Sequence, residues 1–412
     1  MGFSNPGSMR RFQTGFELPG HGALRGACPA LGRRLHHRCQ SQTKSDGYLT
    51  CPMVIETAEI LTKVETVPTP FWSSFAGSVG GLWLGHRAVY APFSGEPEPI
   101  AMDGKNKVYY LSQCCVEERK LSDEGVDCIV RHEARATQKT VLEEQMRDAG
   151  KLEFSRMRDD SNEWEVDTIE QDQDGLFIFD GGSYSRGPLA LCEDHFLQDD
   201  DEEEGYTPTE KVHVIENCLQ WNGEERVRIS VSFAAELIEP ENGGLDPELD
   251  ISLLRVAVNR ETWEGVPGQY TSSSQSESDE KSKKDSGETR IPQDEMQGFW
   301  NVFEVHVSRV EDVDMKTGHL VTMPIYSSQE FQKVYQPGNM FEGPACALDG
   351  GTLWLPHRVV LQVSVPAASE DTGLEISMLW SPGKGKFLNM TRSYSTLGAF
   401  KECICSTGLK KS

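Results

Sequence analysis

The sequence has no uninterrupted apolar stretch close to the roughly 18 residues that a membrane-spanning helix needs. It also lacks a nucleophile elbow, a P-loop, an H-E-x-x-H motif and a G-x-G-x-x-G turn after a strand pattern. Its eleven cysteines include no C-x-x-C pair, and its histidines have no metal-ligand spacing. We therefore expect no membrane span, assign no catalytic residue and no metal ligand, and favour a protein that is not an enzyme.

Basic residues are scarce outside the N-terminal segment. Residues 1–45 contain seven Lys or Arg and one acid, Glu17, whereas the whole chain has 40 basic and 65 acidic residues. After residue 45, 33 basic residues remain against 64 acidic ones, a net charge of −31. Because a body with this charge repels polyphosphate, we expect no nucleic acid among its partners.

The N-terminal segment 1–45 has the composition of an organellar transit peptide. It is rich in Arg, poor in acids and dotted with Gly, Ser and His, and it lacks the apolar centre of a secretory signal. We expect a plastid protein, in the chloroplast stroma first of all, with the mitochondrion as the alternative location. A basic tail that is never removed is the other interpretation of this segment.

Short runs of alternating apolar and polar residues, separated by Gly, Pro and Asn, fill most of the chain. Asn222-Gly223 between the runs 212–219 and 226–233 predicts a β-hairpin. Further strands are expected over residues 86–90, 107–116, 127–131, 176–179, 251–262, 299–310, 320–327, 352–355, 358–365, 374–380, 387–393 and 399–405. This spacing predicts an all-β, mainly antiparallel fold, a sandwich or a barrel, with one or two helices.

Four other segments have different patterns. Residues 140–157 are spaced as an amphipathic helix, and 54–67 fit a short helix or a strand. The six acids of 199–204 indicate a solvated loop. The Ser-rich and charged stretch 268–290 cannot bury apolar surface, so we expect it to be disordered.

Gly81-Leu82-Trp83 begins the strand pattern that ends near Tyr90. It resembles the G-x-W with which lipocalin-type barrels begin, in which the Trp closes the barrel floor under a basic residue from a late strand. On this resemblance, Arg392 is the expected partner of Trp83, and Arg228 is the second choice.

A wider set of motifs is similar to an uncharacterised lipocalin-like (calycin) family of cyanobacteria and plastids. The motifs are Phe71-Trp72-x-x-Phe75, Gly81-x-Trp83, Gly181-x-x-x-x-x-Gly187-Pro188, Trp354-Leu355-x-x-Arg358 and Arg392-x-Tyr394-x-x-x-Gly398-x-Phe400. They cover roughly residues 71–405 in scattered blocks. That family is distantly similar to the chromophore lyases that attach bilins to phycobiliproteins. The resemblance implies a lipocalin-like β-barrel, but no bilin-handling residue of a lyase can be matched to a position here, so lyase activity is not carried over.

Four arginines lie on strand patterns, where a buried guanidinium needs an acidic partner or an anionic ligand. With one Trp and one Tyr they make up the candidate ligand-binding residues, which are Trp83, Arg226, Arg228, Arg358, Arg392 and Tyr394. A small barrel commonly holds one apolar molecule. A tetrapyrrole or a fatty acid, which has an apolar body and carboxylate ends, suits both features. Most cysteines are expected to be buried free thiols, with a regulatory disulfide as the alternative.

These observations predict four segments: a transit peptide (1–45), a first lipocalin-like β-barrel region (46–267), a disordered linker or inserted loop (268–295), and a C-terminal β region that completes or repeats the barrel (296–412). A weak echo between 218–228 and 378–392 is compatible with two barrel-like halves and equally with two hairpins of similar chemistry. We expect a plastid lipocalin-like protein that binds a hydrophobic or tetrapyrrole-like small ligand in a barrel cavity. The alternatives are a chromophore-lyase-like enzyme acting on a tetrapyrrole and a non-catalytic plastid assembly or scaffold protein.

Overall fold

The computed structural model describes residues 53–92, 95–102, 105–107, 109–120, 127–136, 164–192, 211–238, 248–265, 290–313, 318–337, 351–364 and 372–411. Contacts divide the chain into residues 1–38 and 39–412, and every described residue belongs to the second unit. The expected transit peptide, the helix over 140–157, the acidic loop 199–204 and, apart from Arg290, the stretch 268–290 lie outside the described residues.

Nine antiparallel strands form one sheet, here called the N-terminal sheet, in the order β8-β7-β6-β3-β13-β12-β11-β10-β9. The strands are β3 (Gly81–Tyr90), β6 (Tyr110–Lys120), β7 (Asp127–Ala136), β8 (Trp164–Glu170), β9 (Leu176–Ile178), β10 (Tyr184–Arg186), β11 (Val212–Trp221), β12 (Glu225–Ile238) and β13 (Glu248–Gly265). The strands β4 (Ile100–Met102) and β5 (Lys105–Lys107) pair separately. The hairpin of β11 and β12 is confirmed, and its turn residues Asn222 and Gly223 have φ values of 54° and 74°, as a type I′ turn requires.

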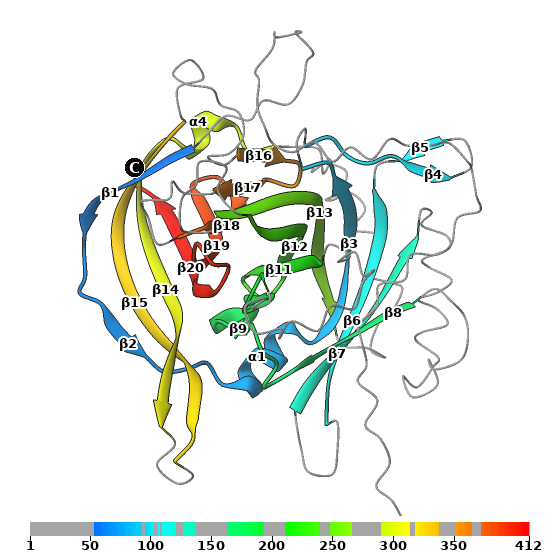
Figure 1. Ribbon diagram of the computed structural model, residues 1–412. Coiled ribbons are helices and arrows are strands. Elements are labelled where there is room, and N and C mark those ends of the chain that lie inside the picture. The colour runs from blue at the N-terminus through cyan, green and yellow to red at the C-terminus, as the bar shows by residue number, and fades with distance from the viewer. Residues whose placement is uncertain are drawn as a thin grey trace, which may run out of the picture. The chain divides into compact units, whose positions relative to one another are not determined.

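A second sheet of nine strands, the C-terminal sheet, has the order β1-β15-β14-β20-β19-β18-β17-β16, with β2 also paired to β15. The strands are β1 (Met53–Ile60), β2 (Glu65–Val67), β14 (Gly298–Val313), β15 (Leu320–Pro337), β16 (Gly351–Leu355), β17 (Val359–Ser364), β18 (Leu374–Gly383), β19 (Lys386–Tyr394) and β20 (Phe400–Lys410). Residues 54–67 thus form strands. We placed them in the first region, but β1 and β2 lie beside β15 of the C-terminal sheet (Figure 1).

Both sheets are curled, and each pairs the first strand of its half with the last (Figure 1). In the N-terminal sheet β3 pairs with β13, and in the C-terminal sheet β14 pairs with β20. First-to-last pairing is what closes an up-and-down meander, so the predicted all-β, barrel-like fold is confirmed. The hairpins β11–β12 and β18–β19 occupy corresponding places, because each consists of the two strands that come directly before the last strand of its half.

The two halves also begin alike, because a second G-x-W motif, Gly298-Phe299-Trp300, opens β14. Gly81 and Gly298 have φ values of 109° and 112°, a conformation that favours glycine. Trp83 takes the place in β3 that Trp300 takes in β14. This duplication, which the sequence analysis did not identify, supports two barrel-like halves.

Each of these tryptophans is anchored by a short helix just before its strand. The helices are α1 (Trp72–Val79) and α4 (Gln293–Met296). The indole Nε1 of Trp83 donates to the carbonyl of Val79 at 3.0 Å, and that of Trp300 donates to the carbonyl of Met296 at 2.8 Å. Both donors are buried, so each bond satisfies a polar group that would otherwise be costly.

The two sheets share one apolar core. Side chains of β12 and β13, such as Ile229 and Val258, form a cluster with Leu361, Met378 and Trp380 of β17 and β18. These residues alternate along their strands with the residues of the opposite face. The faces turned away from the shared core are called the inner faces below.

Candidate functional site

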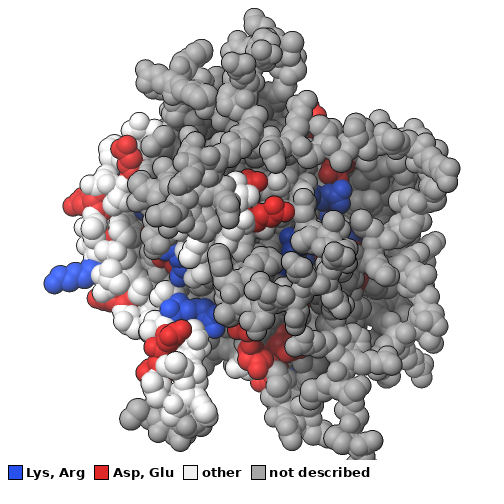
Figure 2. Space-filling model, in the orientation of Figure 1, with Lys and Arg blue, Asp and Glu red and all other residues white. Residues whose placement is uncertain are grey.

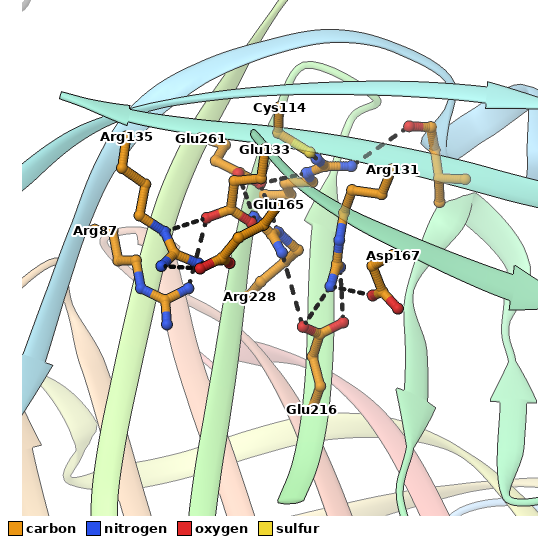
Figure 3. A network of polar contacts seen from close by, with 12 residues as sticks. Arg87, Cys114, Arg131, Glu133, Arg135, Glu165, Asp167, Glu216, Arg228 and Glu261 are labelled. Carbon is orange, nitrogen blue, oxygen red and sulfur yellow. Dashed lines mark hydrogen bonds and ion pairs between the residues drawn. The ribbon is translucent and has the colours of Figure 1, made fainter. Parts of the chain in front are cut away.

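The inner face of the N-terminal sheet carries a largely buried group of paired charges, here called the arginine–carboxylate network (Figure 3). Its members are Arg87, Arg131, Glu133, Arg135, Glu165, Asp167, Arg186, Glu216, Arg226, Arg228 and Glu261. Glu133 on β7 accepts a hydrogen bond from Arg228 on β12 at 2.9 Å, although three strands separate β7 and β12 in the sheet. This contact therefore crosses the hollow of the curled sheet.

The centre of the network is Glu261 between two arginines. Arg228 donates to it through Nε at 2.9 Å and through a terminal nitrogen at 2.7 Å, and Arg226 donates through Nε at 2.7 Å. Burial raises the pKa of Glu261, but Arg226 and Arg228 outweigh burial and lower it to about 2. All three side chains are fully buried, so the site holds a charged cluster that is satisfied internally.

A second cluster joins β7, β8, β10 and β11. Arg131 donates to both oxygens of Glu216, at 2.8 and 3.0 Å, and to Asp167 at 2.7 Å. The hydroxyl of Tyr184 donates to Glu216 at 2.7 Å. Burial opposes ionisation of Glu216, but Arg131 and Arg186 hold its pKa well below the usual value. Bidentate pairing of this kind fixes geometry as well as charge.

The expected contact between Trp83 and a strand arginine is present, but its arginine is Arg226. The guanidinium carbon of Arg226 lies 4.0 Å from the centroid of the Trp83 ring. Naming Arg392 first and Arg228 second was wrong. Arg226, which stacks on Trp83, lies on β12 of the same sheet, whereas Arg392 lies on β19 of the C-terminal sheet.

Arg392 and Tyr394 lie instead where the two sheets meet. Arg392 donates to the carbonyls of Gly175, Gly187 and Pro188 at 3.0–3.1 Å and to the hydroxyl of Tyr394 at 2.8 Å. Its guanidinium is satisfied by backbone carbonyls, which hold segments beside β9 and β10 against β19. These contacts give both residues a structural role.

Arg358 occupies a third place. It forms an ion pair with Glu295 of α4 and donates to the carbonyl and hydroxyl oxygens of Ser381, at 3.0 and 2.9 Å. The six candidate residues are therefore not brought together. Three of them, Trp83, Arg226 and Arg228, share the inner face of the N-terminal sheet.

The same inner face contains polar residues that the sequence analysis missed. Asn259 of β13 is directly opposite Arg87 of β3 on one side and Arg228 on the other. Ser112 of β6 is directly opposite Arg135. Asn259 and Ser112 are fully buried. The sequence contains one indication of this placement. Asn259 is two residues from Glu261 in the same strand, so the two side chains point to the same face of the sheet.

The inner face of the C-terminal sheet has its own polar group around Glu304. Lys333 and Ser406 donate to Glu304 at 2.7 and 3.0 Å, and His306 lies between Glu304 and Glu402 at 3.5 and 3.3 Å. Hydrogen bonds to Glu304 and Glu402 raise the pKa of His306 to about 9. Sequence reasoning did not single out this group, because its members come from three separate strands, β14, β15 and β20.

The cysteines of the described residues are free thiols, and five of them are buried, as expected. No three His, Cys, Asp or Glu side chains among the described residues are grouped to hold a metal ion. Neither helix in the described ranges has the length and apolar character of a membrane span.

No protein-family model matches the chain, and neither does any curated protein. Among solved structures, the chain is similar to a protein of unknown function from the DUF3598 family of Nostoc punctiforme. The two are 13% identical, with a TM-score of 0.45, and the match covers 83% of this chain and 100% of that one. A Bacteroides fragilis protein is 6% identical, with a TM-score of 0.14, covering 82% of this chain and 100% of that one. Function therefore has to be inferred from the chain's own residues.

Proposed function

We propose that the protein binds a small molecule with an apolar body and an anionic end on the inner face of the N-terminal sheet. The observation that carries this proposal is the difference between the two ends of that face. At one end Trp83, Phe75 and Val79 are buried together with α1. At the other end Arg87 and Arg135 are 20% and 25% exposed. One end is sealed, and the other presents guanidinium groups to solvent.

The charge of the network supports an anionic ligand. The network contains six arginines and five carboxylates, so one positive charge is unmatched within it. A partly buried, unmatched positive charge attracts an anion more strongly than an exposed one, because solvent screens it less. On the outer surface the two signs mix, since Figure 2 shows basic and acidic side chains interspersed on one face of the described residues.

The candidate residues divide into two roles under this proposal. Trp83 and Arg226 form the sealed end, and Arg228 joins them in holding the sheet in its curl, because the charges of both arginines are already paired with carboxylates. Arg358, Arg392 and Tyr394 hold other elements together. Contact with the anionic end of the ligand is therefore assigned to the partly exposed end of the network.

A linear tetrapyrrole and a fatty acid are two ligand classes that combine an apolar body with carboxylates. The test is a titration of the full-length chain with biliverdin and with oleate. Binding is measured by the quenching of tryptophan fluorescence and by calorimetry. Saturable binding of at least one compound, with one site per chain and micromolar affinity or better, is the expected result. If neither compound binds saturably, the proposal fails.

The composition of residues 1–45 supports a location in the chloroplast stroma. The full-length radiolabelled chain, offered to isolated chloroplasts and mitochondria, should become protease-resistant and shorter in chloroplasts. Import by mitochondria alone would replace the plastid with the alternative location.

A further inference from the structure

One row of side chains crosses the inner face of the N-terminal sheet near its partly exposed end. The row runs from Arg228 on β12 through Asn259 on β13 to Arg87 on β3. Ser112 on β6 lies in the adjacent row, directly opposite Gly85 and Arg135. Residues directly opposite each other in an antiparallel ladder point to the same face, with Cβ atoms about 5 Å apart. The four side chains therefore share one small patch of the inner face.

Two members of this patch are buried without a hydrogen-bond partner. The amide oxygen and nitrogen of Asn259 have none among the described residues, and neither does the hydroxyl of Ser112. Burying such a group without a partner is unfavourable, so most buried polar groups are paired. Asn259 leaves one donor group and one acceptor open, and Ser112 leaves a hydroxyl open.

Arg87 is the least satisfied guanidinium of the network. Within the described part of the chain it makes a single ion pair, 3.5 Å to Glu133, and no hydrogen bond. Glu133 already accepts hydrogen bonds from Arg228 at 2.9 Å and Arg135 at 3.0 Å. Burial and repulsion by Arg135 lower the pKa of Arg87 to about 10 in spite of Glu133. An added anion would relieve this repulsion.

We propose that Arg87, Asn259 and Ser112 form a subsite for a carboxylate of the ligand, an inference that rests on the proposed function. The carboxylate oxygens accept hydrogen bonds from the Arg87 guanidinium, the Asn259 amide nitrogen and the Ser112 hydroxyl. The Asn259 amide oxygen remains free to accept a hydrogen bond from a ligand that carries an N–H or hydroxyl group, as biliverdin does and oleate does not. The ligand class is thus a carboxylic acid.

The test compares matched acid and ester pairs on the full-length chain. The pairs are biliverdin with its dimethyl ester and oleate with methyl oleate, and the measured quantity is the ratio of ester to acid Kd. Wild-type protein should bind the acid of at least one pair about tenfold or more tightly than the ester, because a hydrogen bond to a charged group contributes about 1.5–3 kcal/mol. In Arg87→Gln and in Asn259→Leu the ratio should fall to about one.

Asn217 supplies a matched control. It is also fully buried with both amide atoms unpartnered among the described residues. However, it alternates on β11 with Glu216 and Cys218 and so faces away from the network. The ratio of ester to acid Kd in Asn217→Leu should equal that of the wild type. An equal fall in Asn217→Leu and Asn259→Leu would overturn the subsite.

The remaining outcomes separate the subsite from the proposed function. If acids and esters bind wild-type protein equally, the ligand-binding function stands and the carboxylate subsite is wrong. If neither acid nor ester of either pair binds, both are wrong. Arg87→Gln keeps the test decisive should Asn259→Leu fail to fold, because Arg87 is partly exposed and makes only one long ion pair.

Discussion

Arg226 lies over the indole ring of Trp83, and this stack closes the sealed end of the inner face of the N-terminal sheet. The second half repeats the arrangement with a different side chain. There Phe387 packs on Trp300 with ring centroids 5.0 Å apart, in the hairpin that corresponds to that of Arg226. The first closure therefore ties the sealed end to the charged network through Glu261, whereas in the second the amino group of Lys410 lies 5.7 Å from the centroid of the Trp300 ring.

The Trp83 closure should be important for stability. Trp83→Ala removes a fully buried indole and its stack with Arg226, which should lower the free energy of unfolding by about 3–5 kcal/mol. Trp263, directly opposite Trp83 in the ladder and 40% exposed, is the matched control. Urea denaturation of Trp263→Ala should show a clearly smaller loss, and equal losses would argue against a special role for the closure.

Removing one carboxylate from the network should cost more than removing an exposed one. Glu216→Gln leaves Arg131 and Arg186 short of a buried negative charge, and breaking a buried pair costs about 3–5 kcal/mol. Glu117 pairs with Arg119 at the surface, where a salt bridge is worth at most about 1 kcal/mol. The free energy of unfolding of Glu216→Gln, measured by chemical denaturation, should therefore be well below that of Glu117→Gln. Similar values for the two variants would contradict the role given to the network.

The network also predicts the acid sensitivity of the fold. The folded-state pKa of Glu261 is lowered to about 2, and those of Glu133 and Glu216 are lowered as well. A lowered pKa contributes stability that is complete above the unfolded value of about 4.5 and is lost as the pH falls through the folded value. Unfolding free energies should therefore be steady near pH 6 and fall steeply between pH 4.5 and 2. A flat profile over this range would mean that the carboxylates are not ionised in the folded state.

Much of the fold was predictable because strand signals are local. The alternation of 212–219 and 226–233 around Asn222-Gly223 specified both strands and their turn. Partner choice was not local. The late position of Arg392 in the chain predicts it as the partner of Trp83, but the chain contains two halves, and each closes on itself. The second G-x-W at Gly298 is the signal in the sequence for the second half.

The candidate site was predictable only in part. Arg226 and Arg228 were identified because an arginine on an apolar strand pattern needs a partner, although which partner depended on pairing. Asn259 has no charge that demands a partner, and its spacing of two residues from Glu261 indicates only that the two side chains share a face. The ladder between β13 and its two neighbours is what places Asn259 among buried charges. Sites built across several strands are therefore hard to derive from one sequence.

The last prediction concerns alkaline pH and His306. The carboxylates of Glu304 and Glu402 hydrogen-bond the ring and raise its pKa to about 9, while Lys333, which donates to Glu304, is the nearby positive charge. A raised pKa contributes stability that is complete below the unfolded value of about 6.5 and is lost as the pH rises through the folded value. Because His306 is partly exposed, the loss between pH 6.5 and 9 should be about 1–2 kcal/mol.

His306→Gln should remove this loss, so that its free energy of unfolding changes little from pH 6.5 to 9. Glu402→Gln takes away one of the two carboxylates and should move the loss to lower pH, because the ring then keeps only Glu304 as a hydrogen-bonding acid. Denaturation curves at half-unit pH steps for the three proteins measure both effects. Parallel pH profiles for wild type and His306→Gln would show that another group causes the alkaline loss.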